Sequence, residues 1–159
     1  MDLTELSQAI KTEAVRLGFT HIGVAPPRKA PHYRAFRQWI QKGLHGDMAY
    51  LARQDSLKKR GDTREILAGC QAIICLAMPY HPPTTRPDDI LPGKGRISSY
   101  AITHDYHHII WEKLDALETF IHNQVGETFH TRSYVDTGPI LERSYANLAG
   151  LGAVGKNTC

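Results

Sequence analysis

The sequence has 159 residues, of which 42% are hydrophobic and 22% are charged, and its 19 Lys and Arg against 16 Asp and Glu give a formal charge of +3. This composition excludes a disordered tail, a collagen-like fibre and a coiled coil, and the length predicts one domain over residues 1–159. The longest apolar run, residues 72–78, is much shorter than the roughly 20 residues of a membrane-spanning helix, and no signal peptide begins the chain, so we expect a cytoplasmic protein.

The first 25 residues predict an amphipathic helix followed by a strand. Asp2 and Glu5 have the spacing of a capping box at the start of the helix, and Gly18 is placed to end it. The apolar stripe of this helix consists of Leu3, Leu6, Ile10, Ala14 and Leu17. Residues 19–25 then have the pattern of a strand, which the two prolines after it stop.

The next stretch predicts two helices and a buried strand. We expect a helix over residues 33–42 and a short helix over residues 47–53. Basic and polar residues from 54 to 64 separate them from the following apolar stretch. Residues 71–80 form a nearly continuous apolar run and are expected to be the most deeply buried strand.

The C-terminal half is richer in glycine and proline. A loop over residues 82–95 has the length and composition of a binding segment or of a disordered one. Asp105 is placed to cap the longest helix, over residues 106–124. The other expected elements are strands over residues 97–101 and 128–135, a helix over residues 139–148 that begins at Pro139, and a glycine-rich loop from residue 149 onwards.

These elements alternate irregularly along the chain. The pattern favours an α/β or α+β fold, with a mixed sheet sandwiched by helices, over a regular doubly wound sheet. Residues 150–155 spell G-x-G-x-x-G, but no strand precedes them and no amphipathic helix follows, so they are a weak signal for a dinucleotide site.

Three cysteines, Cys70, Cys75 and Cys159, are an odd number with no CxxC pair, so we expect no disulfide framework. Cys70 and Cys75 lie in or beside the apolar strand and are expected to be inert. Polar side chains gather beside glycine and proline in residues 46–51, 96–108 and 135–143. The second group contains three histidines, at 104, 107 and 108, but it lacks an HExxH pattern and holds one carboxylate, so we expect no metal site there.

The third group contains the strongest candidates for chemistry. Asp136 lies between an expected strand and an expected helix, and it is either a helix cap or an acid that a substrate can reach. Proton donation at neutral pH would require an apolar pocket or a charged neighbour. Adjacent residues on a helix diverge, so Glu142 and Arg143 cannot both face one small group. The guanidinium fork makes Arg143 the better phosphate candidate, and the alternative is a solvated surface arginine.

Together these segments resemble the N-terminal domain of epoxyqueuosine reductase, the cobalamin-dependent family that completes queuosine in tRNA. Residues 135–143 match best, followed by residues 149–152 and 155–158. Residues 46–51 and 105–107 add support at compatible positions. The resemblance covers essentially the whole chain and implies an N-terminal cobalamin-binding domain.

The resemblance also implies a reaction, the reduction of epoxyqueuosine to queuosine as the last step of this tRNA modification. The proton-donating aspartate of the family corresponds to Asp136, which favours its acid role. Arg143 is implied to contact the substrate or tRNA, and no residue is implied as a protein ligand to cobalt. Contacts to cobalamin or the modified base are implied for Arg60, Tyr100, Asp105, His107, Gly155, Lys156 and Asn157.

The sequence departs from the family pattern in two ways. Ala153 stands where an aromatic residue is common, and the chain ends at Cys159, before a domain that carries two 4Fe–4S clusters. The cysteine runs that ligate those clusters are not in this sequence, so we expect a truncated chain that ligates none and has no evident electron route of its own. The alternatives are a non-catalytic corrinoid-binding module, a reductive dehalogenase-like enzyme and a globular domain without a ligand. We expect a monomer and assign no electron donor.

Overall fold

The computed structural model describes residues 2–80, 93, 95, 97–101, 104–126 and 129–156. The chain divides into two compact units. The first, here called the helical unit, comprises residues 1–20 and 78–128, and the second, the sheet unit, comprises residues 21–77 and 129–159. Most of the loop expected over residues 82–95 lies outside the described residues.

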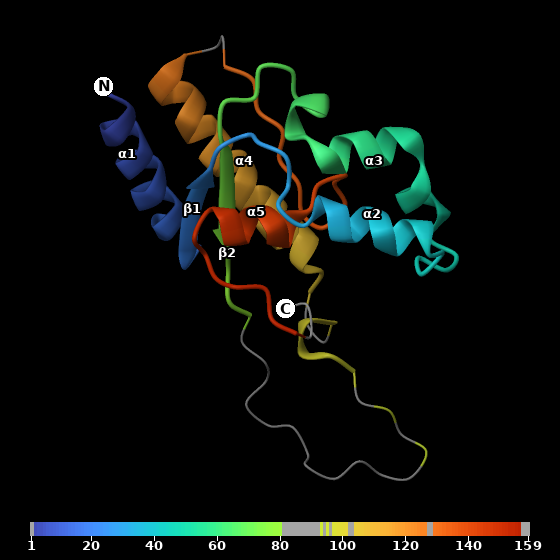
Figure 1. Ribbon diagram of the computed structural model, residues 1–159. Coiled ribbons are helices and arrows are strands. Elements are labelled where there is room, and N and C mark those ends of the chain that lie inside the picture. The colour runs from blue at the N-terminus through green and yellow to red at the C-terminus, as the bar shows by residue number, and fades with distance from the viewer. Residues whose placement is uncertain are drawn as a thin grey trace. The chain divides into compact units, whose positions relative to one another are not determined.

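The helical unit contains helices α1 (Leu3–Arg16) and α4 (Tyr106–Val125), blue and gold in Figure 1, and the short 3₁₀ helix η3 (Ser99–Ala101). The expected capping box is present, because the Asp2 side chain accepts from the backbone of the first turn and the Glu5 carboxylate accepts from the Asp2 N–H at 3.0 Å. Three of the four orphan N–H groups at this helix end, those of Asp2, Thr4 and Glu5, are thereby satisfied, and the boundary predicted from the sequence is confirmed.

Apolar residues from both helices form the core of this unit. Ile10 and Ala14 of α1 are buried, as are Leu117 and Ile121 of α4, and the two α1 residues belong to the apolar stripe expected for the first helix. The Lys113 ammonium donates to the Leu17 carbonyl at 2.5 Å, which places a cation on an unpaired carbonyl at the C-terminal end of α1. Among the described residues, no helix is both long and apolar enough to cross a bilayer.

The sheet unit is built on two antiparallel strands, β1 (His21–Ala25) and β2 (Ile73–Ala77), in a register that pairs Gly23 with Cys75. Helices α2 (Tyr33–Gln41), α3 (Gln54–Gly61) and α5 (Glu142–Leu148) belong to the same unit (Figure 1). Two 3₁₀ turns, η1 (Ala49–Ala52) and η2 (Thr63–Glu65), flank α3. The fold is therefore α+β, as expected.

Helix α5 is fixed to the segment after β1 by buried contacts. Tyr145 is 1% exposed and packs with Ala25 and Ala30, and its hydroxyl donates to the Arg28 carbonyl at 2.8 Å. Burying a side chain of this size stabilises the fold by about 1.5–3 kcal/mol. A Cβ at Gly23 would overlap the Ala149 carbonyl, so only glycine on β1 lets the end of α5 approach the strand this closely.

Five sequence-based predictions need correction. Residues 99–101 form a 3₁₀ turn rather than a strand, and residues 129–135 are irregular, because in the described part of the chain β1 and β2 pair only with each other. Helix α5 begins at Glu142, three residues after Pro139, since an irregular turn intervenes. Residues 54–61, expected only as a polar connection, form α3. The expected strand over residues 71–80 is shorter and only half-buried.

Candidate functional site

Asp136 occupies a tight turn ahead of α5. Its φ is 57°, and among the described residues other than glycine it alone has a positive φ. The Thr137 N–H donates to the Val135 carbonyl at 2.6 Å, which closes a three-residue turn around Asp136. Val135 is buried and anchors the turn, whereas the next residue, Asp136, is exposed at the surface. Such backbone strain is concentrated at functional sites in proteins.

Glu142, the first residue of α5, is the direct partner of this turn. Its Oε1 accepts from the Asp136 N–H at 3.1 Å. The N-cap of α5 is Leu141, so Asp136 does not cap the helix, and the capping interpretation is wrong. A second carboxyl group, that of Glu142, therefore lies against the turn, six residues along the chain.

Burial raises the pKa of the Glu142 carboxyl to about 7. The nearby Asp136 carboxyl adds to this rise through its charge, while the Arg143 charge opposes it. Burial also raises the pKa of the Cys75 thiol to about 11, with a contribution from the Glu142 charge. Cys75 therefore stays a neutral thiol on β2, which agrees with its expected inertness.

Arg60, on α3, also interacts electrostatically with Glu142. It is half-buried, its guanidinium donates to the Ser56 hydroxyl one turn earlier, and it lies 5.9 Å from the centre of the Phe36 ring. Burial lowers the pKa of Arg60, and its interactions with Tyr50 and Glu142 oppose that shift. Arg143 is exposed, next to half-buried Glu142, so the two adjacent residues face different environments as expected.

Three expected cofactor contacts, Tyr100, Asp105 and His107, lie together in the helical unit. Asp105 caps α4, and one of its oxygens accepts from the His107 N–H at 2.9 Å and contacts the His107 ring nitrogen at 2.7 Å. These bonds, the backbone one first, lower the pKa of the Asp105 carboxyl. Tyr106 stacks on the His107 ring at 4.2 Å and meets the Tyr100 ring edge-on at 6.1 Å.

The C-terminal contacts expected at Gly155 and Lys156 lie in an exposed, irregular stretch of the sheet unit, and Asn157 lies outside the described residues. The described part of the chain contains no group of three or more His, Cys, Asp or Glu side chains placed to hold a metal ion. These residues therefore offer no ligand set for an iron–sulfur cluster, and we assign them no step through one.

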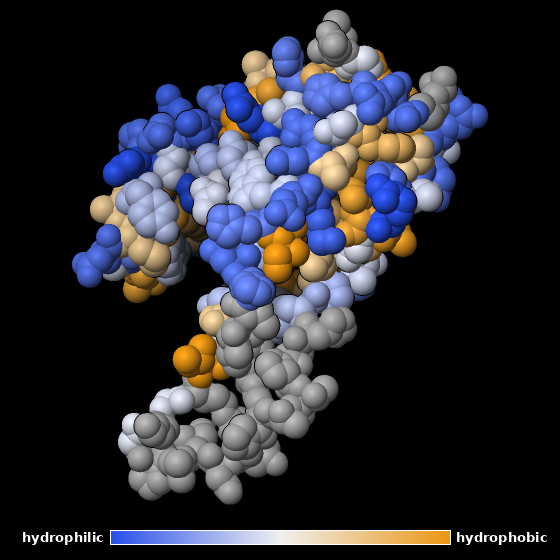
Figure 2. All heavy atoms as spheres, turned by 180° about the vertical axis from the view of Figure 1, so that it is seen from behind, coloured by the Kyte–Doolittle hydropathy of each residue, from blue (hydrophilic) through white to orange (hydrophobic). Residues whose placement is uncertain are grey.

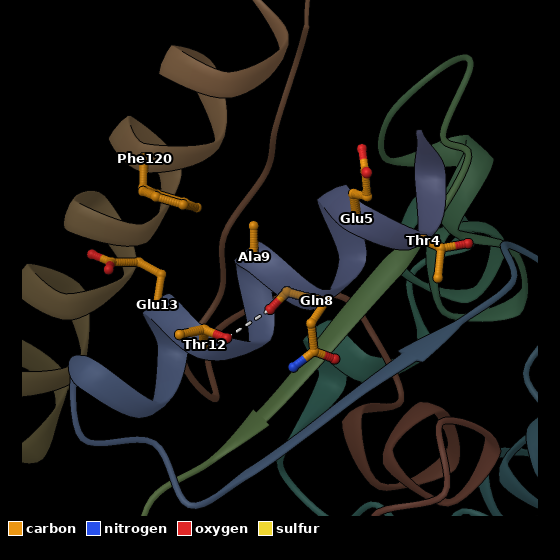
Figure 3. Close-up of a pocket in the computed structure, with 7 residues that line it drawn as sticks. All are labelled: Thr4, Glu5, Gln8, Ala9, Thr12, Glu13 and Phe120. Carbon is orange, nitrogen blue, oxygen red and sulfur yellow. Dashed lines mark hydrogen bonds between the residues drawn. The ribbon is translucent and has the colours of Figure 1, made fainter. Parts of the chain in front are cut away.

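A separate open hollow of about 600 Å³ lies between α1 and α4 in the helical unit. Figure 3 shows Phe120 of α4 and Ala9 of α1 facing this space, with the acidic side chains at its edges. Glu5 belongs to the capping box and Glu13 is paired with Arg16 at 2.6 Å, so both carboxylates already have partners. None of the expected site residues that the structure describes lines this hollow. Its lining residues are Thr4, Glu5, Gln8, Ala9, Thr12, Glu13 and Phe120.

Glu142 is a residue of this site for which the sequence indicated no role. The reasoning that Glu142 and Arg143 diverge was correct, but phosphate geometry drew attention to the arginine. The usable signal was the six-residue spacing between two carboxylates across a Thr-Gly-Pro turn, which brings a helix-start glutamate back towards the loop before it.

Comparison with known proteins finds relatives along almost the whole chain. Residues 60–137 match the family described as "Epoxyqueuosine reductase QueG, DUF1730". The epoxyqueuosine reductase of Pseudomonas aeruginosa is 38% identical over 159 residues, which are 99% of this chain and 43% of the relative. The epoxyqueuosine reductase structure from Streptococcus thermophilus matches at a TM-score of 0.79 and 25% identity, over 95% of this chain and 40% of that one.

A crystal structure of epoxyqueuosine reductase with an epoxyqueuosine-modified tRNA-Tyr stem loop shares the fold at a TM-score of 0.76 and 24% identity, over 99% of this chain and 41% of that one. The fold is that of the α+β region of a class of reductases. The chain carries the DUF1730 region of the epoxyqueuosine reductase family and is similar to a curated epoxyqueuosine reductase along almost its whole length. It spans about half or less of the length of the curated relatives it matches.

Proposed function

We propose that this chain is the cobalamin-binding part of an epoxyqueuosine reductase and that Asp136 is its proton donor. The observation that carries the proposal is the exposed, left-handed Asp136, whose N–H donates to the Glu142 carboxylate, within a chain related along almost its whole length to such reductases. Removing the epoxide oxygen as water requires protons on a poor leaving group, and a positioned carboxyl group can supply one.

The side chains available for the cofactor suit its chemistry. Tyr100 and Ile97 are 53% and 66% exposed in the helical unit, and they offer apolar surface of the kind that covers a corrin ring. Figure 2 shows apolar side chains emerging among hydrophilic ones on one face of the molecule. In the sheet unit the exposed Lys156 and the backbone of Gly155 offer donors for the amides or phosphate of cobalamin.

When bound, cobalamin supplies the reducing cobalt centre, and the protein residues bind, orient and protonate. We assign cofactor contacts to Arg60, Tyr100, Asp105, His107, Gly155, Lys156 and Asn157. Arg143, which is exposed and follows Glu142 on α5, is assigned to a phosphate or base of the substrate. The substrate class is tRNA bearing epoxyqueuosine, as in the stem-loop complex of the related reductase. We further propose that the protein is a cytoplasmic monomer of one domain.

A titration of the purified 159-residue chain with cobalamin, followed by visible absorption and equilibrium dialysis, tests the proposal. We expect the chain to retain the cofactor with a shifted cobalt spectrum and the Lys156→Ala variant to retain less. Circular dichroism on the same samples separates unfolding from lost binding. A folded chain that retains no cobalamin would overturn the proposal for this chain by itself, and a chain that binds cobalamin but supports no turnover within a complete reductase would favour the non-catalytic corrinoid-binding module.

A further inference from the structure

The backbone of Asp136 adopts a conformation that an L-residue keeps only when its surroundings impose it. Its φ of 57° lies in the left-handed region, which favours glycine, although aspartate tolerates it better than most residues. Two hydrogen bonds hold the turn, one from Thr137 to Val135 and one from the Asp136 N–H to Glu142. The second bond comes from a different element, because Glu142 belongs to α5.

The Glu142 carboxyl group lies against the Asp136 turn, because its Oε1 accepts from the Asp136 N–H at 3.1 Å, and its pKa is raised to about 7. Arg143 on the same helix and Arg60 on α3 favour the ionised form of Glu142. Burial and the Asp136 carboxyl favour its protonated form, and the neutral Cys75 thiol on β2 is a further titratable neighbour. Burial is the largest of these influences.

We propose that Glu142 is a positioning residue for Asp136, holding its backbone in the turn through the N–H bond and sharing one proton with its carboxyl group. The inference rests on the proposed function, in which Asp136 delivers a proton. One proton passes from the Glu142 carboxyl to the Asp136 carboxylate and then to the substrate oxygen. The Glu142 O–H bond breaks, an O–H bond forms on the substrate, and two carboxylates remain, with Arg60 near Glu142. Exposed Asp136 then takes a proton from water.

The shared proton is tested by carbon-13 NMR of the full chain labelled at the glutamate carboxyl carbons, over pH 4–9. We expect one glutamate signal to titrate near pH 7, to be missing in Glu142→Gln, and to move to a lower midpoint in Asp136→Asn. Asp136 is exposed, so its substitution spares the fold. Glu65→Gln, at an exposed glutamate in η2, is the matched control and should leave the Glu142 midpoint unchanged.

The positioning role is tested by hydrogen exchange of the Asp136 amide. Glu142→Ala removes the acceptor, so this amide should exchange up to about tenfold faster, the change expected for one lost hydrogen bond. Glu142→Gln keeps a carbonyl oxygen in place and should leave the exchange rate close to that of the unaltered chain. The glutamine variant therefore separates the two roles, because it retains the acceptor and removes the proton.

A Glu142 signal that keeps its midpoint in Asp136→Asn would overturn the shared proton, because burial alone would then explain the titration. Asp136 exchange that is the same in Glu142→Ala and in the unaltered chain would overturn the positioning role. Neither measurement requires cofactor or substrate. A shared proton in a chain that retains no cobalamin would therefore overturn the proposed function and leave this inference standing.

Discussion

The loops that lead into α4 and α5 each carry an aspartate, and the surroundings of the two carboxyl groups are opposite. Asp105 accepts hydrogen bonds from the backbone and ring of His107, and these bonds lower its pKa. Asp136 faces a second carboxyl group, and the pKa of that partner is raised to about 7. Donors fix a carboxylate in its charged form, whereas a neighbouring carboxyl group retains a proton that can be transferred.

The difference follows from where each helix begins. Helix α4 starts directly after Asp105, so the side chain lies over the free N–H groups of the first turn. Helix α5 starts six residues after Asp136, and the intervening turn points the aspartate away from those groups and towards Glu142. Asp105 immediately precedes its helix and caps it, whereas Asp136 is six residues from α5 and is available for acid chemistry.

The largest effect is expected for Asp136→Asn in a complete reductase that carries this chain. Asparagine cannot donate a proton to the leaving oxygen, so epoxide reduction should fall by at least about 10²-fold, the usual contribution of a positioned acid. Cobalamin binding should persist, as measured by its visible spectrum. Asp55→Asn, at an exposed position in the first turn of α3, is the control. Turnover of Asp136→Asn equal to that of this control would contradict the acid role.

A smaller effect is expected for Gly138→Ala, which disturbs the α5 loop through packing. A Cβ at Gly138 would overlap the Tyr134 ring, so the ring or the turn around Asp136 must move. Overpacking of this kind costs about 1–3 kcal/mol, which urea unfolding can measure. Gly152→Ala is the matched control, because a Cβ there meets nothing within 4 Å. Equal unfolding midpoints for the two variants would mean that the loop accommodates the added methyl group without loss of stability.

The smallest effect is expected at Asp105. Asp105→Ala removes the cap and should lower the melting temperature, whereas Asp105→Asn retains a capping oxygen and should stay close to the unaltered chain. Because the folded pKa of Asp105 lies below its ordinary value of 3.8, its stabilisation is present above that pH and is lost as the pH falls through the lowered value. The difference in melting temperature between Asp105→Ala and the unaltered chain should therefore be smaller at pH 3 than at pH 7. A constant difference would contradict the charge contribution.

Much of the fold was predictable because its signals are local. The capping box at Asp2, the apolar stripe of α1 and the Asp105 cap depend on residues within a turn or two of each other. Such patterns determine helix boundaries before any tertiary contact forms. The strands expected over residues 97–101 and 128–135 failed because a strand requires a partner, and alternation in the sequence does not supply one.

The sequence alone narrowed the fold to an α/β or α+β class and determined the helix starts at Leu3 and Tyr106 and the candidacy of Asp136. Only the tertiary structure decided that Asp136 is not a cap and that Glu142 is its partner. The physical reason is that a pKa depends on burial and on nearby charges, which come from α3, β2 and α5 together. No local pattern in the sequence encodes that convergence.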